Sequence, residues 1–252
     1  MTKLVQQKFG ADAADYAASP AHAKGQSLAR LVELVAPKPS WRVLDVATGA
    51  GHTALAFAPH VAKVTASDIT DSMLAEAKRL AAERGLTNFK TARAKAEDLP
   101  FPDMSFDLVT CRLAAHHFSD PASLVAESVR VLMSGGTFAL VDNISPKDED
   151  LARAYNNFEK LRDPSHARCL SLAEWKSLVG NAGFEIAHSE LMDQEIGFAL
   201  WAARMRCSNA TVALLKTRLH ESPLHEFLRP RETGSGLVFT LQEGIIVPRK
   251  TG

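Results

Sequence analysis

Residues 43–54 read Val-Leu-Asp-Val-Ala-Thr-Gly-Ala-Gly-His-Thr-Ala, and this stretch decides the fold. An apolar strand ends at Asp45, and a loop of small residues follows with Gly49 and Gly51. A helix begins directly after the loop. Glycine has no Cβ, so the backbone can bend sharply there and a ligand can lie against it. Free N–H groups at the helix start favour a negatively charged ligand group. The stretch therefore predicts a nucleotide-like cofactor.

Short apolar runs alternate with helical patterns on both sides of this stretch. The predicted strands are 43–46, 61–67, 89–94, 106–111 and 137–142, and the predicted helices are 24–35, 71–85 and 121–132. Such alternation is typical of a parallel sheet with right-handed crossovers, and nearly continuous apolar strands indicate that both faces are covered. We expect a doubly wound α/β fold. Its mostly parallel, seven-stranded sheet has an antiparallel last strand and carries helical cover insertions.

The alternation stops after residue 142. The later patterns predict a helix at 149–161, a loop at 162–166 and a further helix that is capped by Ser171 and runs to about 182. They also predict a strand at 184–191, helical spacing around 200–219 and one or two short strands at 237–247. We expect a single domain over residues 1–252. Its parts would be an N-terminal lid and helix (1–36), a cofactor-binding core (40–145), a substrate-specificity cover (146–236) and a terminal strand (237–252).

Composition excludes several classes of protein. Lys plus Arg and Asp plus Glu both number 29, so the neutral balance gives no support for a nucleic-acid or membrane-surface role. The three cysteines are far apart, which argues against a disulfide framework or a cysteine zinc site and fits a reducing compartment. No run approaches the ~20 apolar residues of a membrane span. We expect a cytoplasmic monomer or homodimer without a metal site.

Two readings of the glycine loop compete. Residues 49–54 match the dinucleotide pattern G-x-G-x-x-G/A, and Asp68 ends the second strand where a ribose-binding acid belongs in enzymes that use NAD. Asp45 argues against NAD as the cofactor, because a carboxylate beside the pyrophosphate of NAD would repel it. A carboxylate before the glycines suits a cationic ligand end instead.

Further stretches repeat a known arrangement: Leu44–Gly51, Ala66–Leu74, Ala96–Phe101, Ser105–Asp107 and Val131–Gly136. Together they make the chain resemble the S-adenosylmethionine-dependent methyltransferases with a Rossmann-like fold. The resemblance covers residues 40–145 and is greatest to the small-molecule branch that includes the ubiquinone and menaquinone C-methyltransferases. It implies S-adenosylmethionine as cofactor and a small molecule as methyl acceptor.

The resemblance also implies roles for particular residues. Asp68 would accept hydrogen bonds from both ribose hydroxyls, since a carboxylate accepts two donors in one plane. Asp45 would order the loop and favour the ammonium of the methionine part. The other expected cofactor residues are Thr48, Gly49 and Gly51 under the methionine part, Ile69 and Met73 on the adenine, the Ala96 and Glu97 backbone at the adenine edge, and the Arg112 segment, which offers a carbonyl.

Two positions depart from the family pattern. Ala47 stands where the family usually has glycine, so we expect a negative φ at Ala47 and the bend at Gly49. Lys95 stands where a carboxylate often binds the adenine amino group, and an ammonium cannot accept a hydrogen bond. Adenine recognition would then depend on backbone groups or on Asp98.

His116 and His117 follow the fourth strand, at the edge where a parallel sheet presents its ligands. A histidine near its ordinary pKa can take a proton at neutral pH, so either residue is a candidate general base for an acceptor that carries a proton. A purely structural role remains open: one ring could cap the helix beginning near Pro121 or order the loop at Arg112.

Candidate substrate residues lie around the same edge. Asp142 and Asn143 end the fifth strand and could hold a substrate hydroxyl or cap the next helix. Arg162 and His166 could bind an anionic or phenolate group, or Arg162 could pair with Asp163. In the N-terminal segment, Tyr16, together with His22, could belong to a lid over the methyl site or to an exposed tail.

Three functions remain to be distinguished. The first is methyl transfer to C, O or N of a small molecule. The second is an NAD-dependent oxidoreductase, although the chain has Glu159 rather than lysine four places after Tyr155. The third is a non-catalytic S-adenosylmethionine-binding module.

Overall fold

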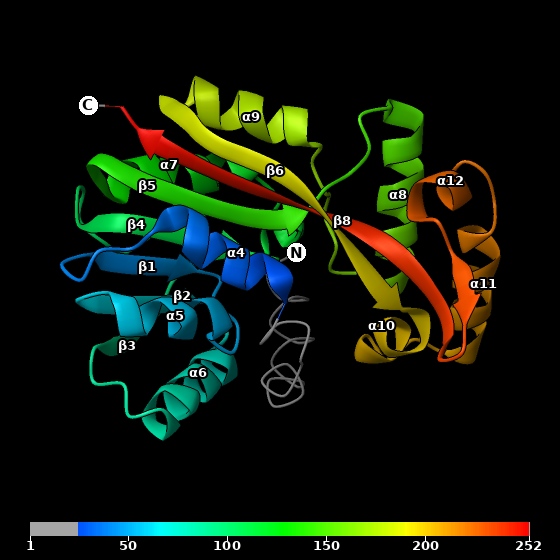
Figure 1. Cartoon of the computed structure of the whole chain (residues 1–252), viewed down its shortest axis with the longest axis horizontal. Coiled ribbons are helices and arrows are strands. Elements are labelled where there is room, and N and C mark those ends of the chain that lie inside the picture. The colour runs from blue at the N-terminus through cyan, green and yellow to red at the C-terminus, as the bar shows by residue number, and fades with distance from the viewer. Residues whose placement is uncertain (1–24, 252) are drawn as a thin grey trace.

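The computed structural model describes residues 25–251. Its strands are β1 (Arg42–Val46), β2 (Lys63–Asp68), β3 (Phe89–Arg93), β4 (Phe106–Arg112), β5 (Leu132–Asn143), β6 (Phe184–Gly197), β7 (Arg231–Thr233) and β8 (Gly236–Lys250). They form one sheet in the order β3-β2-β1-β4-β5-β8-β6, with β7 paired to β8 (Figure 1). β1 to β5 run parallel, and β8 is antiparallel to both of its main neighbours. The predicted doubly wound sheet is confirmed, and β7 adds a short strand to it.

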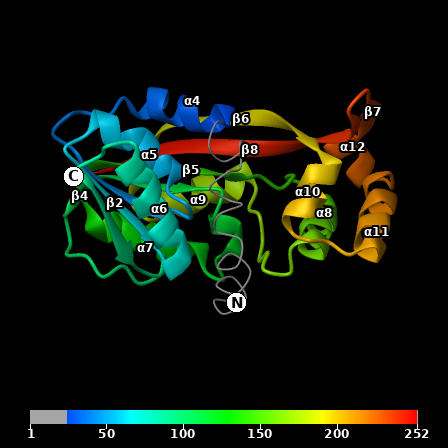
Figure 2. The same cartoon turned by 90° about the horizontal axis from the view of Figure 1, so that it is seen from below.

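Helices cover both faces of the sheet. They are α4 (Gln26–Val35), α5 (His52–Phe57), α6 (Asp71–Glu83), α7 (Pro121–Val131), α8 (Glu149–Arg162), α9 (Leu172–Asn181), α10 (Phe198–Arg204), α11 (Asn209–Leu219) and α12 (Leu224–Leu228), with short 3-10 turns η1 (Ala58–His60) and η2 (Ala115–His117). Successive residues of a strand point to opposite faces. Val43 therefore packs with α4 and α5, and Leu44 packs with α7 and α9. Figure 2 shows α4 and α7 on opposite sides of β8.

A third apolar core lies beside the sheet. β6 and β8 extend past the other strands and reach α8, α10, α11 and α12 (Figure 1). Phe239 of β8 packs there against Trp201 and Phe158, with a ring-centroid distance of 4.9 Å to Trp201. Farther along the same strand, Ile246 belongs to the core beneath the sheet. β8 thus joins the sheet to the helices that we call the cover helices, α8 and α10 to α12.

Local predictions succeeded where a capping signal was present. Ser171 caps α9 with a reciprocal bond to Glu174, as expected. The helical spacing expected around 200–219 is divided between two helices, α10 and α11, because Arg206 between them has a φ of 50° and Ser208 caps α11. Asp71 is the first residue of α6. Within residues 25–251, no helix is both long and apolar enough to cross a membrane.

Candidate functional site

A cleft opens at the edge of the sheet where the parallel strands β1 to β4 end. Ligands of open α/β sheets bind at this edge, because every strand presents the segment that follows it there. The lining consists of residues 47–50, 52, 53, 68–70, 73, 94–97, 112–114 and 117–119. It contains the following predicted cofactor residues: Ala47, Thr48, Gly49, Asp68, Ile69, Met73, Ala96, Glu97 and Arg112.

The loop after β1 has left-handed backbone at alternate residues. φ is 52° at Ala47, 52° at Gly49 and 88° at Gly51, so the expected negative φ at Ala47 is wrong. The Thr48 N–H donates to Ser67 O at 2.8 Å, and the Gly51 N–H donates to Thr48 O at 2.9 Å. These bonds hold the loop in a conformation that costs alanine about 1 kcal/mol and glycine almost nothing.

Gly51 lies behind the cleft, where α5 meets α6. A Cβ on Gly51 would lie 2.8 Å from the Ala77 Cβ, so only glycine allows this approach. Gly49 differs, because nothing lies within 4 Å of its Cβ position. The space above Gly49 is the cleft itself, which leaves room for a ligand against the backbone.

Asp45 also lies behind the loop, with 1% of its surface exposed. Its carboxylate accepts from Thr48 Oγ1 (2.5 Å), from Thr110 Oγ1 (2.6 Å) and from the Ala54 N–H (3.2 Å). Burial raises the pKa of Asp45 to about 6, although the hydrogen bonds oppose the rise. Asp45 therefore ties the loop to β4 and to α5. The sequence did not predict this role for Thr110. A polar residue inside an otherwise apolar strand is the sequence feature that could have indicated it.

Asp68 ends β2 and lines the cleft. One carboxylate oxygen accepts from the Gly49 N–H and the other from the Thr70 N–H, both at 2.9 Å. Burial raises the pKa of Asp68 despite these bonds. Since each carboxylate oxygen has two lone pairs, Asp68 can accept further bonds from a ligand diol.

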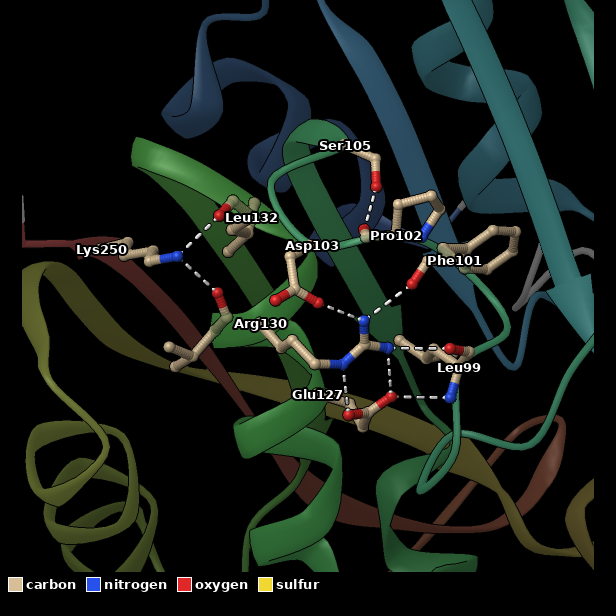
Figure 3. A network of polar contacts seen from close by, with 10 residues as sticks. Leu99, Phe101, Pro102, Asp103, Ser105, Glu127, Arg130, Leu132 and Lys250 are labelled. Carbon is tan, nitrogen blue, oxygen red and sulfur yellow. Dashed lines mark hydrogen bonds and ion pairs between the residues drawn. The ribbon is translucent and has the colours of Figure 1, made fainter.

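The wall after β3 is held from below by Arg130 of α7 (Figure 3). Its guanidinium donates to the carbonyls of Leu99 and Phe101 at 2.8 and 2.7 Å. Glu127 pairs with the same guanidinium and accepts from the Leu99 N–H at 2.8 Å. This network fixes the segment that follows residues 94–97, the part of the wall that lines the cleft.

His117 lines the cleft, and His116 lies beside it with ring centroids 4.2 Å apart. His116 Nδ1 lies 2.6 Å from Asp142 Oδ1, and a carboxylate accepts, so the ring donates Nδ1–H. Burial lowers the pKa of His116, but Asp142 outweighs it, and the pKa lies above its ordinary value. His117 Nδ1–H donates to Ser165 O at 3.2 Å. Burial and the neighbouring His116 lower the pKa of His117 to about 3.

Two predicted substrate residues, Asp142 and His166, are buried next to His116 and do not line the cleft. Asp142 is 1% exposed, and His166 is 2% exposed with Nε2 bonded to Asn156 Oδ1 at 2.8 Å. Burial, with the charge of His116, lowers the pKa of His166 to about 2. The His166 ring stacks on His116 at 5.6 Å.

Arg162 belongs to the cover helices. Its guanidinium bonds Glu159 at 3.2 Å and lies over the Trp201 ring at 4.6 Å, so the expected pair with Asp163 is replaced by one with Glu159. Asn143 is half-buried at the end of β5. Tyr16 and His22 lie outside the described residues. Across residues 25–251, no three His, Cys, Asp or Glu side chains gather closely enough to hold a metal ion.

Comparisons with known proteins agree with this geometry. The family described as methyltransferase domain matches residues 44–140. The uncharacterized methyltransferase YcgJ of Bacillus subtilis is 44% identical over 170 residues, which is 68% of this chain and 67% of YcgJ. The crystal structure of YcgJ superposes with a TM-score of 0.85 at 35% identity, over 90% of this chain and 98% of that one. The ubiquinone/menaquinone biosynthesis C-methyltransferase UbiE of Shewanella piezotolerans is 32% identical over 50% of this chain and 51% of its own length.

Proposed function

The chain belongs to the S-adenosylmethionine-dependent methyltransferases with a Rossmann-like fold, and we propose that its cleft binds this donor and passes the methyl group to a small molecule. The observation that carries the proposal is Asp68. Its carboxylate ends β2, lines the cleft and is bonded to the backbone of Gly49 in the glycine loop. An acid that can accept hydrogen bonds from a diol is thus bonded directly to a backbone segment that is open to a ligand.

The residues that line the cleft could hold the adenine, the ribose and the methionine part of the donor one after another along the edge of the sheet. The wall at Ala96 and Glu97, with Ile69 and Met73, would hold the adenine, and Asp68 would hold the ribose. The open backbone at Gly49 would lie under the methionine part. Asp45 would favour the ammonium from behind the loop. When bound, S-adenosylmethionine would supply a methyl carbon on a sulfonium, from which a neutral thioether leaves readily, so positioning would account for most of the rate.

His116 and His117 are the candidate groups that would take a proton from the methyl acceptor. His117 donates Nδ1–H to a carbonyl, which leaves its Nε2 as an unprotonated acceptor. Asp142 makes His116 more basic, and the His116 ring lies 4.2 Å from the His117 ring at a tilt of 47°. We propose that neutral His116, whose pKa Asp142 raises, is the more basic member of the pair and takes the proton that leaves O, N or C of the acceptor, while the acceptor atom bonds the methyl carbon and the carbon–sulfur bond of the donor breaks. The 32% sequence identity to UbiE, which is named as a C-methyltransferase, raises C-methylation as one form of the reaction.

Ligand-induced stabilisation tests the proposal without a known acceptor. S-adenosylhomocysteine is expected to raise the Tm of the chain, whereas NADH is not. Asp68→Asn should lose this shift. Asp71→Asn is the matched control, because Asp71 is an exposed acid that pairs at the surface with Arg93. Stabilisation by NADH but not by S-adenosylhomocysteine would favour the oxidoreductase reading.

A methyl-transfer assay distinguishes an active enzyme from a module that only binds S-adenosylmethionine. His116→Gln and His117→Gln should keep S-adenosylhomocysteine binding and lose methyl transfer to a panel of small phenols, hydroquinones and amines. Unchanged transfer in both variants would remove the two histidines from the mechanism.

A further inference from the structure

A second group of polar side chains is buried between the sheet and the cover helices, and its members do not line the cofactor cleft. Tyr155, Glu159 and Arg162 share one face of α8, because residues three and four apart in a helix are neighbours on its surface. Asp142 lies near the end of β5. Asp142, Tyr155 and Glu159 are each at most 1% exposed, so these polar groups are withdrawn from solvent.

The carboxylates of Asp142 and Glu159 lie around the same buried side chains. Burial raises the pKa of Tyr155, and the charges of Glu159 and Asp142 add to the rise. Burial also raises the pKa of Cys169, and the same two charges raise it further. Both charges act on His116 as well, where they oppose burial and raise its pKa. Helix α8 and the end of β5 thus bring two carboxylates to one place beside His116.

Each of these carboxylates already has a cationic partner. Asp142 Oδ1 lies 2.6 Å from His116 Nδ1, and Glu159 Oε2 accepts from Arg162 Nη2 at 3.2 Å. The Arg162 guanidinium lies over the Trp201 ring, 4.6 Å from its centroid. We call Asp142, Glu159, Arg162 and Trp201 the Glu159 cluster. With His116 protonated, the cluster and His116 together carry no net charge, and with His116 neutral they carry one negative charge.

Four atoms of the Glu159 cluster are buried and have no hydrogen-bond partner among residues 25–251. They are Asp142 Oδ2, Glu159 Oε1, Arg162 Nε and Trp201 Nε1. Buried polar atoms of native proteins nearly always have a partner, so four such atoms in one cluster indicate a bound group. Two of the atoms accept hydrogen bonds and two donate them. The group that meets them must therefore both donate and accept.

A neutral hydroxyl group meets this requirement, and a charged group does not. An ammonium only donates, so it would leave Arg162 Nε and Trp201 Nε1 unpaired. A ligand carboxylate or phenolate only accepts, and it would face the carboxylates of Asp142 and Glu159 where little water screens the repulsion. The two acids therefore argue against the anionic group expected at Arg162.

We infer that the Glu159 cluster recognises a neutral hydroxyl group of the methyl acceptor and excludes anionic acceptors. This inference rests on the proposed function and names the class of its acceptor. Asp142 joins the cluster to His116, and the neighbouring ring of His117 lines the cleft. His117 and Arg162 are both partly exposed. The acceptor thus reaches from the methyl site past the two histidines toward the cover helices.

The test is a ligand-observed NMR titration of the chain saturated with S-adenosylhomocysteine. The probes are 4-methylphenol, 4-methylbenzoate and 4-methylbenzylamine, which share a ring and are neutral, anionic and cationic at pH 7. The wild-type chain should bind 4-methylphenol at least about 10-fold more tightly than either charged probe, because one hydrogen bond to a charged group accounts for a difference of this size.

Glu159→Gln keeps the shape of the side chain and removes its charge. The variant should bind 4-methylphenol about 5-fold more weakly and should gain affinity for 4-methylbenzoate, a gain that loss of a purely structural contact would not produce. Asp150→Asn is the matched control, because Asp150 forms an exposed pair with Arg153 in the same helix at 2.9 Å and with the same spacing. It should keep the wild-type affinities. If Glu159→Gln does not fold, Trp201→Phe removes one donor and should weaken only 4-methylphenol.

Three results would overturn the inference while S-adenosylhomocysteine still binds. They are a wild-type preference for either charged probe, binding of none of the three probes, and wild-type affinities in Glu159→Gln or, in its place, Trp201→Phe. A wild-type chain that does not bind S-adenosylhomocysteine would instead overturn the proposed function, and the inference with it.

Discussion

His116 Nδ1 lies 2.6 Å from Asp142 Oδ1, and both side chains are almost fully buried beside the cleft. The pair joins η2 to the end of β5, across neighbouring strands of the sheet. His117 and His166 flank the same imidazole. The positive charge that His116 carries when it is protonated opposes protonation of its two neighbours, and after burial this is the next cause of their lowered pKa values.

Asp142→Asn should lower the pKa of His116 by at least about one unit, because burial then acts without the opposing carboxylate. Titration of the imidazole ¹⁵N resonances measures it. A group whose pKa is raised by folding stabilises the protein below about pH 6.5, its unfolded pKa, and this contribution is lost as pH rises through the folded pKa. The wild type should therefore exceed Asp142→Asn in unfolding free energy by more at pH 5.5 than at pH 9. An equal difference at both would contradict the ion pair.

His166 should make the protein acid-sensitive. Its pKa falls from about 6.5 in the unfolded chain to about 2 in the buried site, so the unfolded state alone binds a proton between these values. Stability is then lost as pH falls below about 6.5, at a limiting slope of about 1.4 kcal/mol per unit. Urea unfolding between pH 6.5 and 5 should show a shallower slope in His166→Gln. His220→Gln, at an exposed histidine, should keep the wild-type slope.

Ala47→Gly should stabilise the protein by about 0.5 to 1 kcal/mol. The gain arises because glycine adopts the φ of 52° without the strain that a Cβ causes, and this exceeds the added freedom of the unfolded chain. Chemical denaturation measures the difference. A loss of stability would show that the methyl group of Ala47, which faces the cleft, has a packing role.

Gly51→Ala should destabilise the protein by about 1 to 3 kcal/mol more than Gly49→Ala. Both positions have a positive φ, so both variants carry backbone strain. Only at Gly51 does the new Cβ also collide, at 2.8 Å from Ala77. Gly49→Ala instead places a methyl group in the open cleft and should reduce affinity for S-adenosylhomocysteine. Equal unfolding free energies for the two variants would contradict the close approach of α5 and α6.

The sequence predicted the parallel sheet because each strand and helix carries its own short-range signal. Apolar runs, the glycine loop and the Ser171 cap are all read within a few residues. It also predicted Asp68, because an acid at a strand end is visible in the same way. It failed at Ala47, since a side chain's own preference gave way to hydrogen bonds from other strands.

The opening stretch by itself determined its own strand, loop and helix, and it predicted a nucleotide-like ligand, since these signals are local in sequence. Only the tertiary structure decided what surrounds it. Thr110 reaches Asp45 from 65 residues away, Ser27 meets Arg112 across 85, and Asp142 meets His116 across 26. Such partners have no local pattern, because packing of the sheet and its helices, not spacing along the chain, brings buried polar groups together.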